Sequence, residues 1–165
     1  MTTPTPAFDP EPMLQVLSRH RVRFVVVGGF AASYHGSVHV TFDLDITPEM
    51  SEANLERLSD ALHELDAQVR AGDESFAFNH DARSLGAATV WNLRTPHGDL
   101  DLTIMPAGTR GYEDLHRDSI TDTVLGVSVE IASLADVVRS KAAADRPKDH
   151  LTLPTLRRLL EEQDG

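Results

Sequence analysis

Apolar residues recur along this chain with two different periods, and each period predicts one kind of element. Spacings of three and four, with helical composition, predict helices at residues 13–20, 30–35, 51–65, 112–117 and 133–145, and within 147–162. Apolar runs and strict alternation predict strands at residues 24–27, 43–46, 88–94, 98–105 and 127–131. Between residues 72 and 86 the pattern dissolves. Helices and strands intermix, which indicates an α/β (α+β) chain.

Several residues favour particular ends for these elements. Ser51 and Ser133 are expected to cap the helices that follow them. Residues 95–98 are turn-prone and are expected to join two strands in a hairpin. Prolines in the first dozen residues predict a flexible tail over residues 1–12. No long linker divides the rest, so residues 13–165 are expected to form a single domain.

Composition excludes several classes of protein. The 165 residues include 15 Lys or Arg against 26 Asp or Glu, and the formal charge of -11 argues against coating nucleic acid through bulk charge. The absence of cysteine excludes disulfides, thiolate metal sites and a cysteine nucleophile. No apolar run approaches the roughly 20 residues of a membrane span. We therefore expect a soluble, cytoplasmic protein with neither a membrane nor a DNA partner.

Two aspartates share one face of the predicted strand at residues 43–46. Asp43 and Asp45 are two positions apart, so both carboxylates project to one side while Leu44 and Ile46 point into the core. Like charges held side by side are unfavourable away from water unless a cation lies between them, and oxygen ligands favour Mg²⁺ or Mn²⁺. The same spacing also occurs on ordinary solvated strand faces, so the pair alone leaves both interpretations open.

A diglycine and a distant acid strengthen the first interpretation. Gly28 and Gly29 lie where a buried strand turns into a helix, where backbone N–H groups can approach a phosphate. An ordinary tight turn would need the same residues. Asp101 alternates with apolar residues in the second hairpin strand. If that hairpin lies beside Asp43 and Asp45, Asp101 would join their cluster and could accept a proton from an attacking hydroxyl.

In combination these residues resemble the signature of the nucleotidyltransferase superfamily. The Gly28-Gly29 turn, the Asp43-Leu44-Asp45-Ile46 strand and the later Leu100-Asp101-Leu102 look like its Gly-Gly turn, its D-x-D strand and its distant third acid. Residues 35–43 and 133–149 are similar to short stand-alone members related to minimal nucleotidyltransferases and AbiEii-type toxins. Those members often carry an arginine where this chain has His39.

The resemblance implies a nucleotidyltransferase fold with a small mixed sheet, flanking helices and a short C-terminal helical extension. It also implies a Mg²⁺- or Mn²⁺-dependent attack by an acceptor hydroxyl on the α-phosphate of a nucleoside triphosphate, with release of pyrophosphate. The metal-binding and catalytic residues would then be Asp43, Asp45 and Asp101. The nucleotide-binding residues would be Gly28, Gly29, Ser33, Lys141, Arg146 and Asp149.

Charge distribution bears on the last three of these residues. Between residues 136 and 160, six Lys or Arg oppose three Asp, so positive charge gathers near the end of an acidic chain. Lys141 and Arg146 are the expected triphosphate clamp, and Asp149 is expected to orient them. A solvated helical face is the alternative, and it is the preferred interpretation for Arg157 and Arg158.

Three functions remain open from the sequence. The first is transfer of a nucleotide to RNA, such as a tRNA end, or to a protein in a toxin-antitoxin-like system, with an antitoxin as partner. The second is a small-molecule nucleotidyltransferase of the antibiotic-modifying kind, which an acidic surface permits. The third is a weakly active nucleotide-binding or partner-binding module, which His39 favours.

Overall fold

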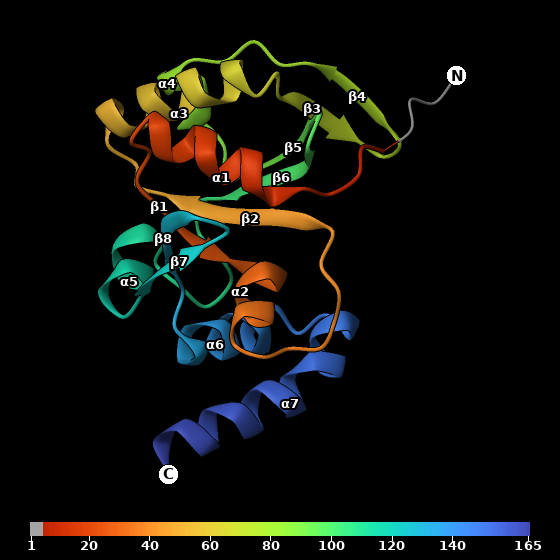
Figure 1. Ribbon diagram of the computed structural model, residues 1–165, viewed down its shortest axis with the longest axis vertical. Helices are drawn as coiled ribbons and strands as arrows, with labels where there is room; N and C mark the ends of the chain where they lie inside the picture. The colour runs from red at the N-terminus through yellow and green to blue at the C-terminus, as the bar shows by residue number, and fades with distance from the viewer. Residues whose placement is uncertain (1–4) are drawn as a thin grey trace.

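The computed structural model describes residues 5–165, which form an eight-stranded mixed sheet with helices on both sides (Figure 1). The strands are β1 (Phe24–Val27), β2 (Asp43–Pro48), β3 (Gln68–Ala71), β4 (Glu74–Ala77), β5 (Val90–Thr95), β6 (Gly98–Thr103), β7 (Ile120–Val124) and β8 (Val127–Ile131). The helices are α1 (Pro10–Arg19), α2 (Gly28–Tyr34), α3 (Glu52–Glu64), α4 (Ala82–Leu85), α5 (Tyr112–Arg117), α6 (Leu134–Ala144) and α7 (Pro147–Asp164). The mixed sheet and flanking helices confirm the predicted fold class.

Two parallel pairings make the sheet mixed. The strand order is β4-β3-β5-β6-β2-β1-β8-β7. Strands β2 and β6 run parallel, as do β1 and β8, whereas β1 and β2 run antiparallel. The hairpin β5–β6 therefore lies beside β2, which is the neighbourhood that the sequence interpretation requires.

The two faces of the sheet differ in chemistry. Helices α1 and α3 lie together on one side, while α2 and α6 lie on the other with α7 beyond α6 (Figure 1). Leu44, Ile46 and Leu100 are fully buried in one apolar cluster together with Leu14 of α1 and Leu58 of α3. Burying each such side chain contributes about 1.5–3 kcal/mol. Alternation along β2 and β6 then directs their polar residues to the opposite face.

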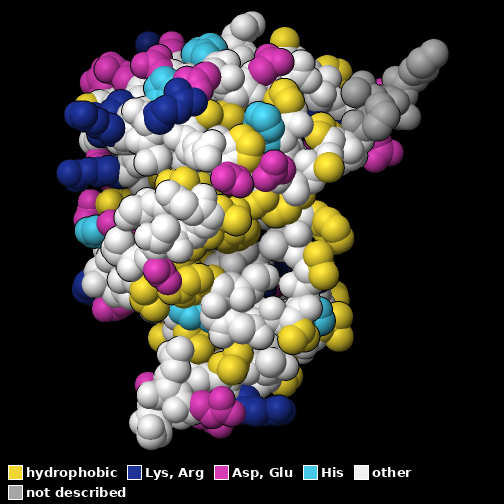
Figure 2. Space-filling model, in the orientation of Figure 1, with side chains coloured by type: hydrophobic (Ala, Val, Ile, Leu, Met, Phe, Trp, Pro, Cys, Tyr) yellow, Lys and Arg dark blue, Asp and Glu magenta, His cyan; other side chains and the backbone are white. Residues whose placement is uncertain are grey.

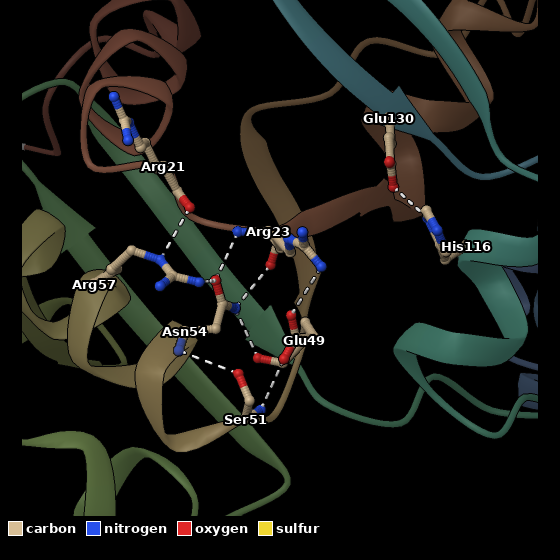
Figure 3. Close-up of polar contacts among 8 residues, drawn as sticks. All are labelled: Arg21, Arg23, Glu49, Ser51, Asn54, Arg57, His116 and Glu130. Atoms are coloured by element: carbon tan, nitrogen blue, oxygen red, sulfur yellow. Dashed lines mark hydrogen bonds and ion pairs between the residues drawn. The ribbon is translucent and has the colours of Figure 1, made fainter.

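A buried amide fastens α3 to the edge of this core. The Asn54 side chain donates to the carbonyls of Arg23 (3.0 Å) and Glu49 (2.7 Å) and accepts from the Arg23 N–H at 2.7 Å (Figure 3). The hydroxyl of Ser51 accepts from the Asn54 N–H, which confirms the expected cap. Because the buried amide is fully hydrogen-bonded, it holds the start of β1 and the end of β2 in one relative position.

The start of the chain departs from the prediction. Helix α1 begins at Pro10 rather than at residue 13, because proline at the first helical position sacrifices no hydrogen bond. Phe8 packs edge-on against Phe30 with ring centroids 6.5 Å apart, and the Asp9 N–H donates to the His97 carbonyl. The predicted flexible tail is therefore wrong for residues 8–12. Residues 1–4 of that tail lie outside the described residues.

Four short elements have no counterpart in the sequence pattern. Strands β3, β4 and β7 consist mostly of half-exposed or exposed residues, so they show no apolar alternation. Helix α4 has only four residues, held by a capping box between Asp81 and Ser84. Within residues 5–165, no helix combines the length and apolar character needed to cross a membrane.

Candidate active site

Strand register brings the three predicted acids onto one face of the sheet. Strands β2 and β6 pair with Asp43 opposite Asp99 and Asp45 opposite Asp101. Paired residues of neighbouring strands project to the same side, so four carboxylates face away from the apolar core. Asp101 thus lies beside Asp45 although the two are far apart in the sequence.

Hydroxyl groups support the first two acids. Thr103 donates its hydroxyl to Asp45 Oδ1 at 2.9 Å, and Thr41 donates to Asp43 Oδ1 at 3.3 Å. Burial raises the pKa of Asp45 to about 6; the Thr103 hydrogen bond opposes this rise and the Asp43 charge adds to it. Burial, together with the neighbouring Asp43 carboxyl, also raises the pKa of Asp101. Burial and the neighbouring carboxyls therefore disfavour the ionised form of Asp45 and Asp101.

The Gly28-Gly29 turn packs directly against these acids. Gly28 opens helix α2 with φ of +65°, and a Cβ there would lie 2.8 Å from Asp45 Oδ2. A Cβ on Gly29 would lie 3.1 Å from the hydroxyl oxygen of Thr41. Only glycine at residue 28 meets both the conformation and the close approach. The turn and the acids consequently share one small space, as the sequence interpretation expects.

A cavity of about 620 Å³ opens over this face. Its walls include Asp43, Asp45, Gly28, Gly29 and residues from α6 and the start of α7. This volume is typical of sites that bind small molecules.

Three apolar side chains of the cavity lining are exposed to solvent. Val40, Phe42 and Leu151 line the cavity although 76%, 73% and 71% of their respective surfaces remain exposed. Figure 2 shows apolar side chains gathered along the flank where residues 37–42 run. Exposed apolar groups at the edge of a cavity are typical of a surface that contacts a ligand or partner.

Positive charge faces the acids from the junction of α6 and α7. Lys141, Arg146 and Lys148 line the cavity, and the charges of Lys148 and Arg146 lower the pKa of Asp45. Asp149 is fully buried beneath them, with Arg146 Nε 2.8 Å and Lys141 Nζ 3.6 Å from its oxygens. Asp149 is thus placed to orient both predicted clamp residues.

The pKa values at this junction follow from burial and pairing. Burial opposes ionisation of Asp149, but hydrogen bonds from the Arg146 side chain and backbone outweigh it and lower the Asp149 pKa. Burial lowers the pKa of Lys141, against the Asp149 charge that raises it. The carboxylate of Asp149 is therefore held ionised between two cations.

Sequence reasoning missed two arginines beside the acids. Arg70 of β3 donates Nη2 to Asp101 Oδ1 at 2.7 Å and Nη1 to Asp99 Oδ2 at 3.0 Å. Arg94 of β5 donates Nε to Asp99 Oδ1 at 2.9 Å. Asp99 is therefore a buried partner of two arginines. The hairpin pattern could have suggested Arg94, since it pairs with Asp99 across β5 and β6, whereas residues 68–71 gave no strand signal.

Two predicted site residues do not line the cavity. Ser33 lies on α2 with its hydroxyl 3.4 Å from the His39 carbonyl, so its place does not support a contact with nucleotide. Asp101 is 8% exposed and does not line the cavity, whereas its partner Arg70 does. Ser37 and Ser140, which the sequence interpretation did not select, line the cavity instead.

The resemblance to nucleotidyltransferases implies a divalent cation at these acids. Within the described part of the chain, no group of three His, Asp or Glu side chains is arranged so that it could hold a metal ion. Asp43 and Asp45 nevertheless fit Mg²⁺ or Mn²⁺ as a pair, because Mg²⁺ commonly takes one or two carboxylates and completes its shell with water and substrate phosphates. Burial and the Asp43 charge raise the pKa of Asp45, and a bound cation would oppose both effects.

Comparisons with known proteins address the fold. No protein-family model matches the sequence, and no curated protein matches it. The lincosamide antibiotic adenylyltransferase LnuA, solved with lincomycin bound, superposes with a TM-score of 0.62 at 12% identity, over 93% of this chain and 99% of its own. The antibiotic-resistance factor ANT(2'')-Ia gives 0.55 at 15% identity, over 93% and 80%.

A protein from Thermotoga maritima assigned as a nucleotidyltransferase gives a TM-score of 0.54 at 17% identity, over 95% of this chain and 97% of its own. At such low identities a superposition establishes architecture and leaves activity to be argued from the site. The chain has the nucleotidyltransferase fold.

Proposed function

We propose that the protein is a metal-dependent nucleotidyltransferase that moves a nucleoside monophosphate from a nucleoside triphosphate to a hydroxyl group. The observation that carries the proposal is the meeting of Asp43 and Asp45 with the Gly28-Gly29 turn in one cavity, opposite the cations of the α6–α7 junction. Phosphoryl transfer requires these parts, because catalysis is mostly positioning and charge neutralisation.

Different residues would bind the metal ion and the phosphates. Asp43 and Asp45 would hold Mg²⁺ or Mn²⁺, which when bound neutralises charge on the phosphate oxygens. Backbone N–H groups of Gly28 and Gly29 would donate to the β- and γ-phosphates. Lys141 and Arg146, oriented by Asp149, would contact the same phosphates, and Lys148 lines the cavity beside them.

The transfer itself replaces one phosphorus–oxygen bond by another. The acceptor oxygen bonds to the α-phosphorus, the bond to the β-phosphate breaks, and pyrophosphate leaves with the electron pair. Asp101 is the proposed acceptor of the hydroxyl proton, because its raised pKa suits a base that operates near neutrality. Arg70 holds Asp101 in the structure described, so this role requires release of that contact.

We propose a small hydroxyl-bearing molecule as the acceptor. Two proteins with the same fold are an antibiotic adenylyltransferase and an antibiotic-resistance factor. The net charge of -11, the volume of about 620 Å³ and the exposed apolar side chains of the cavity lining favour such a molecule over a long polyanion. Transfer to RNA or protein, with an antitoxin partner, is the competing proposal, and the same experiment separates them.

The test is a labelling assay with each of the four nucleoside triphosphates carrying a radioactive α-phosphate. Acceptors are a panel of lincosamides and aminoglycosides, total RNA and a protein lysate, each with Mg²⁺ or Mn²⁺ and with EDTA. Asp43→Asn and Asp45→Asn should each reduce labelling by about a hundredfold or more. Asp60→Asn, an exposed acid on α3, is the matched control. Equal labelling by the site variants would contradict the mechanism, and labelled RNA or protein alone would contradict the acceptor.

A further inference from the structure

Arg70 reaches across one strand to hold the third acid. It belongs to β3, which pairs with β5, and β5 in turn pairs with β6, where Asp101 lies. The guanidinium bridges two carboxylates, with Nη2 2.7 Å from Asp101 Oδ1 and Nη1 3.0 Å from Asp99 Oδ2. All three side chains are largely buried, with 23%, 12% and 12% exposure for Arg70, Asp99 and Asp101. Such charge-assisted, two-pronged contacts are among the stronger ones in proteins.

The guanidinium that holds Asp101 lines the cavity, whereas Asp101 does not. The other three acids of this face, Asp43, Asp45 and Asp99, also line it. The register would otherwise place Asp101 beside Asp45 on the open face. Asp101 is therefore the one acid of this face that is held by a cavity-lining arginine without lining the cavity itself.

This contact also explains why only two acids are free to bind a cation. One oxygen of Asp101 is engaged by Arg70, and within residues 5–165 no three acidic or histidine side chains form a metal-holding group. A guanidinium carries a permanent positive charge, so Arg70 supplies Asp101 with the positive charge that a divalent ion would otherwise supply.

We infer that Arg70 is a positioning residue that takes the place of a divalent cation at Asp101 and has to release this carboxylate before the third acid can act. The inference rests on the proposed function. Asp99 allows the exchange without leaving Arg70 unpaired, because Arg70 keeps its second carboxylate. Arg94 fixes Asp99 independently, with Nε 2.9 Å from Asp99 Oδ1. The two arginines differ in one respect, since Arg94 pairs with Asp99 and Arg70 pairs with both acids.

The experiment measures binding of Mn²⁺ alone, by electron paramagnetic resonance of the free ion, to the full chain and three variants. Arg70→Gln removes the competing charge and should tighten Mn²⁺ binding about tenfold, which corresponds to about 1.4 kcal/mol. Arg94→Gln is the matched control, with the same loss of charge beside Asp99, and should change the affinity less than about twofold. Arg70→Lys keeps the charge and should restore an affinity within about threefold of the original.

Thermal unfolding gives a second readout that needs no turnover. Without metal, Arg70→Gln should melt at a lower temperature than the unchanged chain, and Mn²⁺ should raise its melting temperature by more, because tighter binding stabilises more. If Arg70→Gln unfolds, Arg70→Lys is compared with the unchanged chain in its place, by its Mn²⁺ affinity and its melting temperature.

Each outcome has a defined meaning. Equal gains in Mn²⁺ affinity for Arg70→Gln and Arg94→Gln would reduce the effect to general electrostatics and overturn the inference. An affinity for Arg70→Gln no tighter than that of the unchanged chain would also overturn it while leaving the proposed function intact. Absence of Mn²⁺ binding to every variant would contradict the proposed function and the inference together.

Discussion

At Gly28 the backbone conformation and the packing demand the same residue. Gly28→Ala would place a Cβ 2.8 Å from Asp45 Oδ2 at a φ of +65°. We expect a loss of about 1–3 kcal/mol in the free energy of unfolding, together with reduced nucleotide labelling because Asp45 has to move. Urea denaturation and the labelling assay measure the two effects.

Gly126→Ala supplies the matched control. Gly126 also has a positive φ, of +79°, but a Cβ there would meet nothing within 4 Å. Gly126→Ala should lose only the stability that the positive φ costs an alanine, and it should keep full labelling. If both variants lost labelling equally, the contact between Gly28 and Asp45 would have no functional meaning.

The carboxyl of Asp45 gives the protein a characteristic response to acid. Its pKa is raised from 3.8 to about 6, chiefly by burial, so the folded state binds this proton more tightly than the unfolded state does. In EDTA, the free energy of unfolding should therefore fall as pH rises from about 4 to about 6, between the unfolded and folded pKa values of Asp45. Asp45→Asn should weaken this dependence without abolishing it, because the pKa of Asp101 is raised as well. Denaturant titrations at several pH values measure it, and an unchanged pH profile would contradict the assignment.

Helices α6 and α7 depend on one buried carboxylate between them. Asp149→Asn would leave Lys141, whose side chain is 13% exposed, without its ionised partner. We expect a loss of about 3 kcal/mol in the free energy of unfolding, since breaking a buried pair leaves an uncompensated charge. Because pairing lowers the pKa of Asp149, its stabilising effect should be lost only when pH falls below the ordinary range of an aspartate.

Asp145→Asn is the control for that substitution. Asp145 precedes the same junction, but its side chain is 74% exposed, and asparagine tolerates its left-handed conformation. Its replacement should change stability by less than about 0.5 kcal/mol in urea denaturation. Similar losses in the free energy of unfolding for both variants would show that the buried Asp149 pair does not stabilise the junction.

The extent to which elements were predictable depends on how they are buried. Strands β1 and β2 were predictable because their core residues, such as Val26 and Ile46, are fully buried and leave a clear pattern. Strand β3 was not, because its side chains are half-exposed. Arg70 lies there and finds Asp101 two strands away in the sheet, a distance that no local pattern encodes.

The residue types of the candidate site were predictable, but the contacts between them were less so. The spacing of Asp43 and Asp45 indicated a shared face, and the Gly-Gly turn indicated a close approach. The sequence could not indicate that the missing side chain of Gly28 makes room for Asp45 itself. The family resemblance also placed Ser33 at the nucleotide, but a position one helical turn after the glycine turn does not fix the side of the helix on which a residue lies.

Across the whole molecule, a few cations have to attract a highly charged substrate to an acidic chain. The net charge of -11 repels a nucleoside triphosphate, while Lys148 is exposed at the cavity wall. Lys148→Gln should raise the KM for the nucleotide about fivefold, because one exposed charge near a phosphate is worth about 1 kcal/mol. Its melting temperature should stay unchanged.

Arg157→Gln provides the comparison on the same helix. Arg157 is exposed and does not line the cavity, so the variant loses equal charge away from the site. It should leave the KM unchanged in steady-state labelling. A KM that rises equally in both variants would indicate that overall charge, rather than the position of Lys148, governs binding.

The mouth of the cavity joins segments that are distant in the chain, one before β2 and one in α7. Val40 and Leu151 belong to these segments, and both side chains are largely exposed. Because the chain has no cysteine, cysteines introduced at these two positions would be the only thiols to which spin labels could attach. The distance between the two labels would then report any change in the separation of these two segments. No native cysteine would have to be replaced first.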